Sequence, residues 1–272
     1  MRDRAFEDGT SVVGSAQDPR VHVRLYDGLA LCLLGRPDQA LRLCADARRY
    51  AYASRHPFSE AMAQTISLRV HQLRGEAAVV ASQAGAAIAL CEEHEFVHYI
   101  AMARILRGWA RAQQGEFEKG IAEILGGLEK ERATGASLFE SYSLGLLADA
   151  CLKNKRYDQA FEFLRQVTLD DENTERFYAA EIYRLLGETY LQSRQNFDQV
   201  QQYFSKGLKL AREQNAKCFE LRLCLSMCDL YDLRQNGYSD TCHSQLGETY
   251  KSFGEGFDTA DLVRAKARLE NA

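Results

Sequence analysis

Apolar and polar residues follow one another along this chain with the spacing of amphipathic helices, in segments separated by short turns rich in glycine and polar residues. Apolar residues that recur every three or four positions predict α-helices. No sustained two-residue alternation of β-branched residues predicts a strand. The three prolines, Pro19, Pro37 and Pro57, stand at expected turns or helix starts, and no proline interrupts the later helical segments. The pattern therefore predicts an all-α protein.

A mostly small position recurs along the chain. The aligned residues are Gly28, Leu68, Gly108, Ala148, Gly187 and Cys228, at steps of 40, 40, 40, 39 and 41 residues. A second such position follows twelve or thirteen residues later, at Ala40, Val80, Gly120, Ala160, Val200 and Thr241. Small residues at both positions let paired antiparallel helices approach closely, and stacked pairs bury their apolar stripes. Tyr183–Tyr190 also matches the W-x2-L-G-x2-Y pattern of tetratricopeptide (TPR) repeats, with Tyr for Trp. We therefore predict a right-handed TPR-like superhelix of six helix pairs.

Two sets of helices are expected to alternate. The first helix of each pair is predicted near 20–34, 58–74, 97–114, 137–154, 174–193 and 217–235. The second helix is predicted near 37–54, 76–93, 117–133, 157–168, 197–214 and 240–252. Gly35, Gly75 and Gly115 follow the first three first helices, where glycine favours a left-handed cap. Lys155 takes that place in the fourth pair, which predicts a different closure of its turn.

The predicted organisation has three parts. Residues 1–18 show no repeat and are expected to be a disordered or partial segment, residues 19–253 form the repeat array, and residues 254–272 form a C-terminal capping helix. The string LGETY occurs at Leu186–Tyr190 and again at Leu246–Tyr250. The spacing of 60 residues between the copies breaks the 40-residue step, so we place the second copy inside the last second helix.

Composition argues against several classes of protein. The net charge is -4 at pH 7 and the isoelectric point is about 5.9, without the basic excess that nucleic-acid-binding proteins carry. No apolar run reaches the roughly 18–20 residues that cross a bilayer. The first residues lack the apolar core of a signal peptide. We expect a cytoplasmic protein with no nucleic-acid or membrane partner.

Two groups of residues have spacings that also occur in metal or redox sites. Cys91, His94 and His98 are spaced C-x2-H-x3-H, and Cys224 and Cys228 share one helix face. The first group lacks a second Cys/His pair nearby, and most of the eight cysteines fall within apolar helical patterns, as in protein cores. No Ser-His-Asp or Cys-His arrangement indicates catalysis. We therefore predict no metal, no cofactor and no enzymatic activity.

The inner stripe of the first helices is the candidate binding surface, because these helices line the concave face of TPR superhelices. Counting from each aligned small residue gives its members: Arg69, Gln72, Met102, Ile105, Trp109, Tyr142, Asp149, Glu181, Arg184, Glu188, Arg222, Asp229 and Asp232. The N-terminal half is apolar to basic, and the C-terminal half is rich in acids. An aromatic anchor beside charges suits an extended peptide or a partner helix. We expect a protein- or peptide-binding scaffold; the alternatives are a small-molecule effector pocket around Trp109 and Tyr142, and a self-associating module that forms a homodimer.

Four stretches of the chain resemble a known group of proteins. They are HPFSEAMAQTISLRVHQLRGE (56–76), AMARILRGWARAQQGEFEKGIAEILGGLEKERATGA (101–136), ERFYAAEIYRLLGE (175–188) and EGFDTADLVRAKARLENA (255–272). They look like the C-terminal TPR region of bacterial class III adenylate/guanylate cyclases fused to an AAA-type ATPase, and of related LuxR-type ATP-dependent regulators. No G-x-x-x-x-G-K-[ST] phosphate loop is present. The resemblance thus implies the regulatory segment of a signalling protein, with no catalytic residue to carry over.

Overall fold

The computed structural model of the protein describes residues 18–169, 176–194, 196–234 and 239–271. Residues 1–17, most of the predicted N-terminal segment, lie outside the described residues. Within the described ranges the chain forms thirteen α-helices and no strand. They are α1 Pro19–Leu33, α2 Pro37–Ser54, α3 Pro57–Leu73, α4 Ala77–Glu93, α5 Val97–Gln113, α6 Phe117–Ala133, α7 Glu140–Lys153, α8 Tyr157–Leu164, α9 Ala179–Arg194, α10 Phe197–Glu213, α11 Lys217–Arg234, α12 Ser239–Lys251 and α13 Ala260–Glu270. The predicted all-α fold of six helix pairs with a C-terminal capping helix is confirmed.

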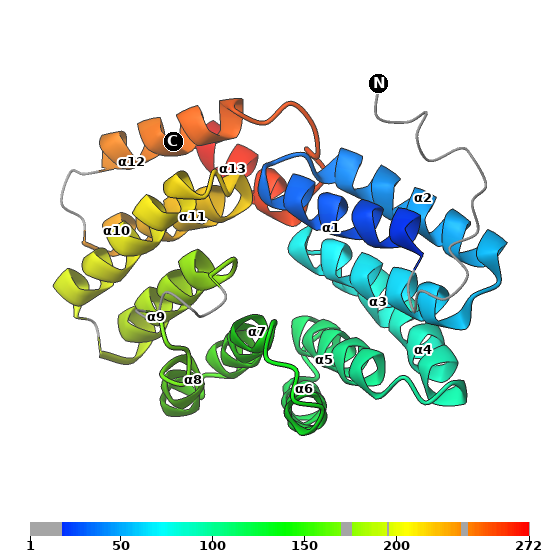
Figure 1. Ribbon diagram of the computed structural model, residues 1–272. Coiled ribbons are helices and arrows are strands. Elements are labelled where there is room, and N and C mark those ends of the chain that lie inside the picture. Colours follow the sequence, from blue (N-terminus) through cyan, green and yellow to red (C-terminus); the bar gives the residue numbers. More distant parts are fainter. Residues whose placement is uncertain (1–17, 170–175, 195, 235–238, 272) are drawn as a thin grey trace.

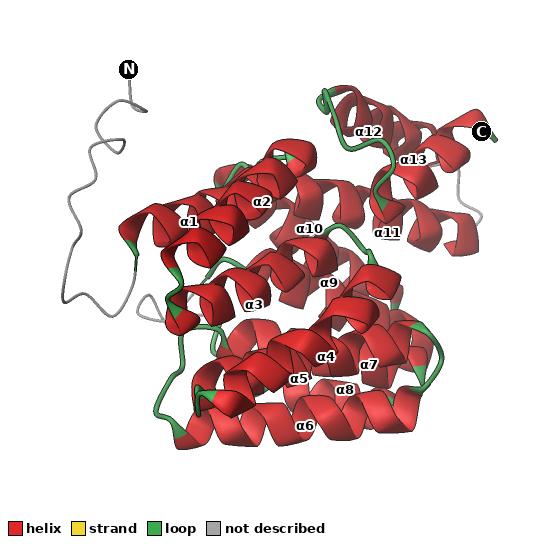
Figure 2. Cartoon of the chain, turned by 90° about the vertical axis from the view of Figure 1, so that its right-hand side faces the viewer, coloured by secondary structure: helices red, strands yellow, loops and turns green. Residues whose placement is uncertain are grey.

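The six pairs curve into a closed ring, with the odd-numbered helices α1 to α11 inside and the even-numbered helices outside (Figure 1). Each helix contacts the next one along the chain, and each inner helix also contacts the next inner helix. Figure 2 shows the ring from its side, with helices alone forming the layers. None of the described helices is long and apolar enough to span a membrane.

The turns repeat with a period that the sequence only partly reveals. Backbone φ is positive at Gly35, Gly75 and Gly115, as predicted, with values of 80, 78 and 88°. Lys155 also has a positive φ of 58°, so the prediction of a different closure there was wrong. Arg55, Glu95, Gly135 and Asn215 close turns after second helices in the same way. A left-handed residue ends each of these helices because it returns the last amides to the open carbonyls of the final turn. Only the glycines reveal this rule in the sequence.

The small positions bring paired helices into close contact. A Cβ atom on Gly108 of α5 would lie 2.7 Å from the carbonyl oxygen of Gly120 on α6, and one on Gly120 would lie 2.6 Å from the carbonyl oxygen of Gly108. The alignment fails in the sixth pair, where Thr241 is exposed and Cys242 faces the inner helix. The second small position of that pair thus follows the first by fourteen residues.

Three helices differ in length from their predicted bounds. α7 begins at Glu140 and α9 at Ala179, later than predicted, while α8 ends early at Leu164. Tight turns replace the missing residues: the Glu140 amide donates to the Ser137 carbonyl, and the Ala179 amide to the Arg176 carbonyl. These turns contain residues that the apolar periodicity predicted to be helical. The repeated LGETY string at 246–250 lies within α12, as predicted.

Candidate functional site

The N-terminal half of the predicted stripe is buried in the structure. Arg69, Gln72, Met102, Ile105, Trp109 and Tyr142 are each exposed by 5% or less. The hydroxyl of Tyr142 on α7 donates a hydrogen bond of 2.8 Å to Oε1 of Gln72 on α3, past the intervening helix α5. The curvature of the ring is thus tight enough for inner helices two repeats apart to touch. The sequence predicts an open groove at these six residues, and in the structure they are buried instead: Tyr142 contacts Gln72 and Arg69, while Ile105 packs against Gly127 of the paired helix α6.

Arg69 is the most unusual member of that closed cluster. Its side chain is almost fully buried, and its guanidinium lies 3.7 Å from the ring centroid of Phe139 and 4.8 Å from that of Tyr142. Nε and Nη1 have no hydrogen-bond partner. Glu131 is a buried acid of the same region, but its carboxylate accepts from the hydroxyl of Ser143 at 3.2 Å, and burial raises its pKa. The two aromatic faces and the negative charge of Glu131 together compensate this buried cation in part.

The C-terminal half of the stripe is partly open, and its acids are neutralised by ion pairs. Among the described residues, every acid of this half has a basic partner. The pairs are Asp149 with Lys153, Glu181 with Arg184 and Arg222, Glu188 with Arg184, Asp229 with Arg264 and Arg268, and Asp232 with Arg268. The predicted stripe did not include Lys153, Arg264 and Arg268, which are the basic partners of three of these acids. The predicted excess of acid is therefore largely cancelled within the protein.

Glu181 lies at the closed end of this half. Burial opposes its ionisation, but the guanidinium groups of Arg184 and Arg222 outweigh burial and hold the pKa of this carboxyl below its usual range. Arg184 donates to both carboxylate oxygens at 2.9 and 2.7 Å. A bidentate pair in a buried setting fixes both side chains firmly. Glu181, Arg184 and Arg222 therefore form part of the ring's framework.

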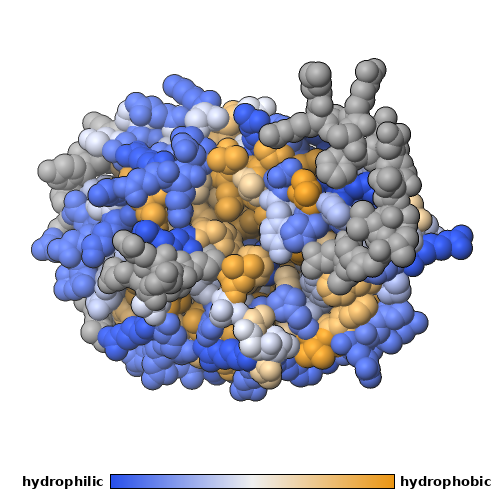
Figure 3. Space-filling view, viewed as in Figure 1, coloured by the Kyte–Doolittle hydropathy of each residue, from blue (hydrophilic) through white to orange (hydrophobic). Residues whose placement is uncertain are grey.

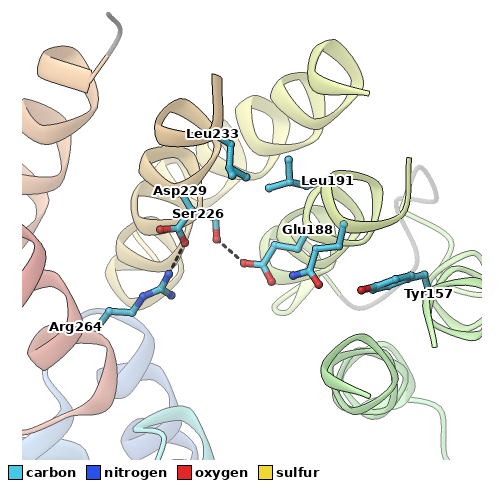
Figure 4. Close-up of a pocket in the computed structure, with 8 residues that line it drawn as sticks. Tyr157, Glu188, Leu191, Ser226, Asp229, Leu233 and Arg264 are labelled. Atoms are coloured by element: carbon cyan, nitrogen blue, oxygen red, sulfur yellow. Dashed lines mark hydrogen bonds and ion pairs between the residues drawn. The ribbon is translucent and has the colours of Figure 1, made fainter. Parts of the chain in front are cut away.

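A cavity of about 540 Å³ opens beside this network (Figure 4). Its lining residues come from four helices: Tyr157 of α8; Glu188, Leu191 and Gln192 of α9; Ser226, Asp229 and Leu233 of α11; and Arg264 of α13. Two leucines and a tyrosine provide apolar surface beside polar groups. Ser226 donates a hydrogen bond of 2.7 Å to Oε1 of Glu188, which joins the α9 and α11 walls.

Of the thirteen predicted residues, only Glu188 and Asp229 line this cavity. Two lining residues that were not predicted could have been found from helical spacing. Leu191 follows Glu188 by three positions and Leu233 follows Asp229 by four, so each shares a helix face with a predicted residue. Arg264 had no such signal, because it belongs to the capping helix outside the repeat. Figure 3 shows the face of the ring seen in Figure 1, with apolar side chains gathered in its middle and polar side chains around its rim. This arrangement can hold a ligand with apolar and polar groups.

The two cysteine-containing groups do not assemble a metal site. Among the described residues, no group of three or more Cys, His, Asp or Glu side chains is placed to hold a metal ion. All eight cysteines are buried and free. Burial raises the pKa of the Cys91 thiol to about 11 despite its hydrogen bond with Thr65. Cys228 and Cys242 face each other between α11 and α12, with their Sγ atoms 2.9 Å apart. Cysteine here fills helix interfaces, as its pattern indicated.

Two solved structures share the fold. The crystal structure of the apo form of RapI is 14% identical, over 93% of this chain and 85% of that chain, with a TM-score of 0.59. The crystal structure of a Rap protein complexed with competence and sporulation factor is 12% identical, over 93% of this chain and 74% of that chain, with a TM-score of 0.63. No family model and no curated protein matches this chain. The structures support the TPR-like part of the resemblance noted above, while the cyclase–ATPase and LuxR part stays a prediction.

Proposed function

We propose that this protein is a non-enzymatic regulatory scaffold that binds a peptide or protein segment in the cavity between α8, α9, α11 and α13. The observation that carries the proposal is the cavity itself, which lies on the inner side of a TPR-like ring and combines leucine, tyrosine and charged side chains. Concave helical-repeat surfaces suit extended or helical segments. One solved structure of similar fold is a complex with competence and sporulation factor, which adds support from the fold alone.

The acid-rich C-terminal half of the stripe does not make a basic ligand the best fit. Because Glu188 and Asp229 already have basic partners, a strongly basic segment would gain little there. A segment with an aliphatic or aromatic anchor and neutral polar groups fits the lining better. Binding energy would come mainly from the anchor beside Leu191 and Leu233. The resemblance to TPR regions of bacterial signalling proteins adds the finer proposal that binding regulates a partner domain.

We expect Leu233→Glu to weaken binding of such a segment by at least about tenfold, or about 1.4 kcal/mol. The substitution places a charge on the apolar wall, while the 62% exposure of Leu233 leaves the fold intact. The probe is a peptide selected from a displayed random library with the full chain, and its affinity is measured by fluorescence anisotropy.

The matched control is Leu138→Glu, since Leu138 is also a 59% exposed leucine but does not line the cavity. The control variant should bind like the wild-type protein. If both variants bind the peptide equally well, the cavity is not the binding site. If no peptide is enriched and the protein sediments as a stable dimer, the self-association alternative replaces the proposal.

A further inference from the structure

The ring closes where α11 and one short segment after α12 meet the N-terminal helices. Phe253–Asp261, which we call the strap, connects α12 to the first turn of α13 and lies against the N-terminal helices (Figure 1). TPR-like arrays usually leave their first and last repeats apart, because each repeat contacts only its neighbours. Here the strap brings the last repeat against the first two.

The strap caps a helix that lacks a cap of its own. The N-cap residue of α2, Arg36, makes no side-chain hydrogen bond to the helix. Glu255 of the strap takes this role, because its Oε1 accepts the amides of Asp38 at 3.0 Å and Gln39 at 2.9 Å. In return, the amide of Gly256 donates to Oδ2 of Asp38 at 3.0 Å. A helix start more than 200 positions away in sequence therefore depends on the strap for its capping.

Two arginines fasten the strap on its other side. Arg74, whose side chain is 2% exposed, pairs with Asp38 at 3.0 Å, Glu76 at 2.7 Å and Asp258 of the strap at 3.1 Å. Arg222 of α11 pairs with Asp261 at 2.6 Å and donates to the Leu73 carbonyl at 2.7 Å. The amide of Ala260 donates to the Arg74 carbonyl at 3.3 Å.

The fit at this joint is close and combines the ion pairs above with buried apolar contacts. A Cβ atom on Gly75 would lie 2.7 Å from Cβ of Ala260, and one on Gly256 would lie 2.1 Å from Cγ of Pro37. Phe253 and Leu262 add apolar contact, yet they border a void of about 20 Å³ at the joint. Water can replace the ion pairs and backbone hydrogen bonds of the joint when it separates, which lowers the free-energy cost of local opening.

Closing the ring also has a cost inside it. Arg69 of α3 is buried against Phe139 and Tyr142 with Nε and Nη1 unpartnered, in the region where Tyr142 of α7 bonds Gln72 of α3. A buried guanidinium with two unpartnered nitrogens disfavours the closed form, because water would satisfy those nitrogens in a wider ring. The strap contacts and the burial of Arg69 therefore act in opposite directions on the same equilibrium.

We propose that the strap is a releasable latch: the ring opens at the joint between Phe253–Asp261 and the α2–α3 region, and opening exposes the inner cluster around Arg69. Opening separates the two ends of the array while each helix pair keeps its own packing. The proposal rests on the proposed function in one respect only, which is that opening admits the bound segment. The latch itself is independent of any ligand.

Hydrogen exchange of the wild-type protein tests the latch directly. We expect the amides of Asp38, Gln39, Gly256 and Ala260 to exchange at least about a hundredfold faster than amides in the middle of α5 and α6, because they open without global unfolding. Equal rates in the two groups would overturn the proposal, since the joint would then unfold only with the whole array.

Two glycines provide a matched pair of variants. Gly75 and Gly115 occupy equivalent turns with φ of 78 and 88°, but a Cβ atom on Gly115 would meet nothing within 4 Å. Asparagine tolerates this backbone region. Gly75→Asn should therefore speed exchange at the four joint amides by at least about tenfold relative to Gly115→Asn, and raise the radius of gyration in solution scattering. Identical behaviour of the two variants, or acceleration of all amides together in Gly75→Asn, would refute a local latch.

Peptide binding separates the latch from the proposed function. If the selected peptide associates faster with Gly75→Asn than with Gly115→Asn, opening admits the ligand. If the joint opens but peptide association is unchanged, the latch stands and its gating role is wrong. If the joint opens and no peptide binds either variant, the proposed function fails while the latch remains supported.

Discussion

Gly108→Leu should destabilise the protein by about 3 kcal/mol or more, near the upper end of the usual cost of overpacking. The inserted side chain would begin 2.7 Å from the Gly120 carbonyl oxygen and 2.8 Å from Cγ1 of Ile124. The first of these is backbone, so the clash is relieved only if α5 and α6 move apart. Because the two helices pack along their whole length, that movement disturbs contacts at both ends of the pair. Urea denaturation monitored by circular dichroism gives the free energy of unfolding.

Gly126→Leu is the matched control, because Gly126 lies inside α6 and a Cβ atom there would meet nothing within 4 Å. Replacing an open helical glycine should stabilise the protein by about 0.5–1 kcal/mol. The two substitutions introduce the same side chain, but Gly108→Leu should lower the free energy of unfolding and Gly126→Leu should raise it. Equal unfolding free energies for both variants would show that α5 and α6 do not approach as closely as the structure places them.

The repeat could be predicted because its physics is local. A small residue every forty positions, glycine at helix ends and apolar periodicity each report on one helix pair, and together they give nearly every helix bound. The turn at Lys155 could not be predicted in this way. Its left-handed turn matches those of the glycines, but a lysine carries no sign of it. The backbone conformation there follows from the packing of α7 and α8, which the surrounding residues determine.

The site could be predicted only in part, because its exposure depends on the curvature of the whole ring. Counting along the helices placed Tyr142 and Gln72 on one stripe. It could not show that α3 and α7 come close enough for the two side chains to bond. The strap is a second feature of this kind. Glu255 reads as one acid in a loop after the last repeat, and nothing nearby in sequence indicates that it caps α2.

Arg222→Met should also destabilise the protein by about 3 kcal/mol, in the range for breaking a buried ion pair. Arg222 is the side chain through which three regions meet. It lies 3.5 Å from Glu181 of α9 and 2.6 Å from Asp261 of α13, and it donates to the carbonyl of Leu73, the last residue of α3. Methionine keeps the apolar volume but leaves the carbonyl and the Asp261 carboxylate without their partner. Glu181 keeps Arg184, so its part of the loss should be smaller.

The dependence of this loss on pH distinguishes ion pairing from packing. The folded pKa of Glu181 lies below its usual value because Arg184 and Arg222 outweigh burial. A depressed folded pKa contributes stability that is fully present above the unfolded pKa of about 4.3 and disappears as pH falls through the folded value. The difference in unfolding free energy between wild type and Arg222→Met should therefore be largest at pH 7 and shrink below about pH 4.

Arg264→Met provides the comparison for a solvated pair, since the Arg264 side chain is 53% exposed beside Asp229. Its loss should stay below about 1 kcal/mol. If Arg222→Met costs no more than Arg264→Met, the ring is not held through α11, and the joint must depend on Glu255 and Arg74 alone. If the cost of Arg222→Met is large but the same at pH 7 and pH 3, the guanidinium acts through packing and its bond to the Leu73 carbonyl. A cost that falls with acid would show that the ionic contact of Arg222 with Glu181 contributes to ring closure.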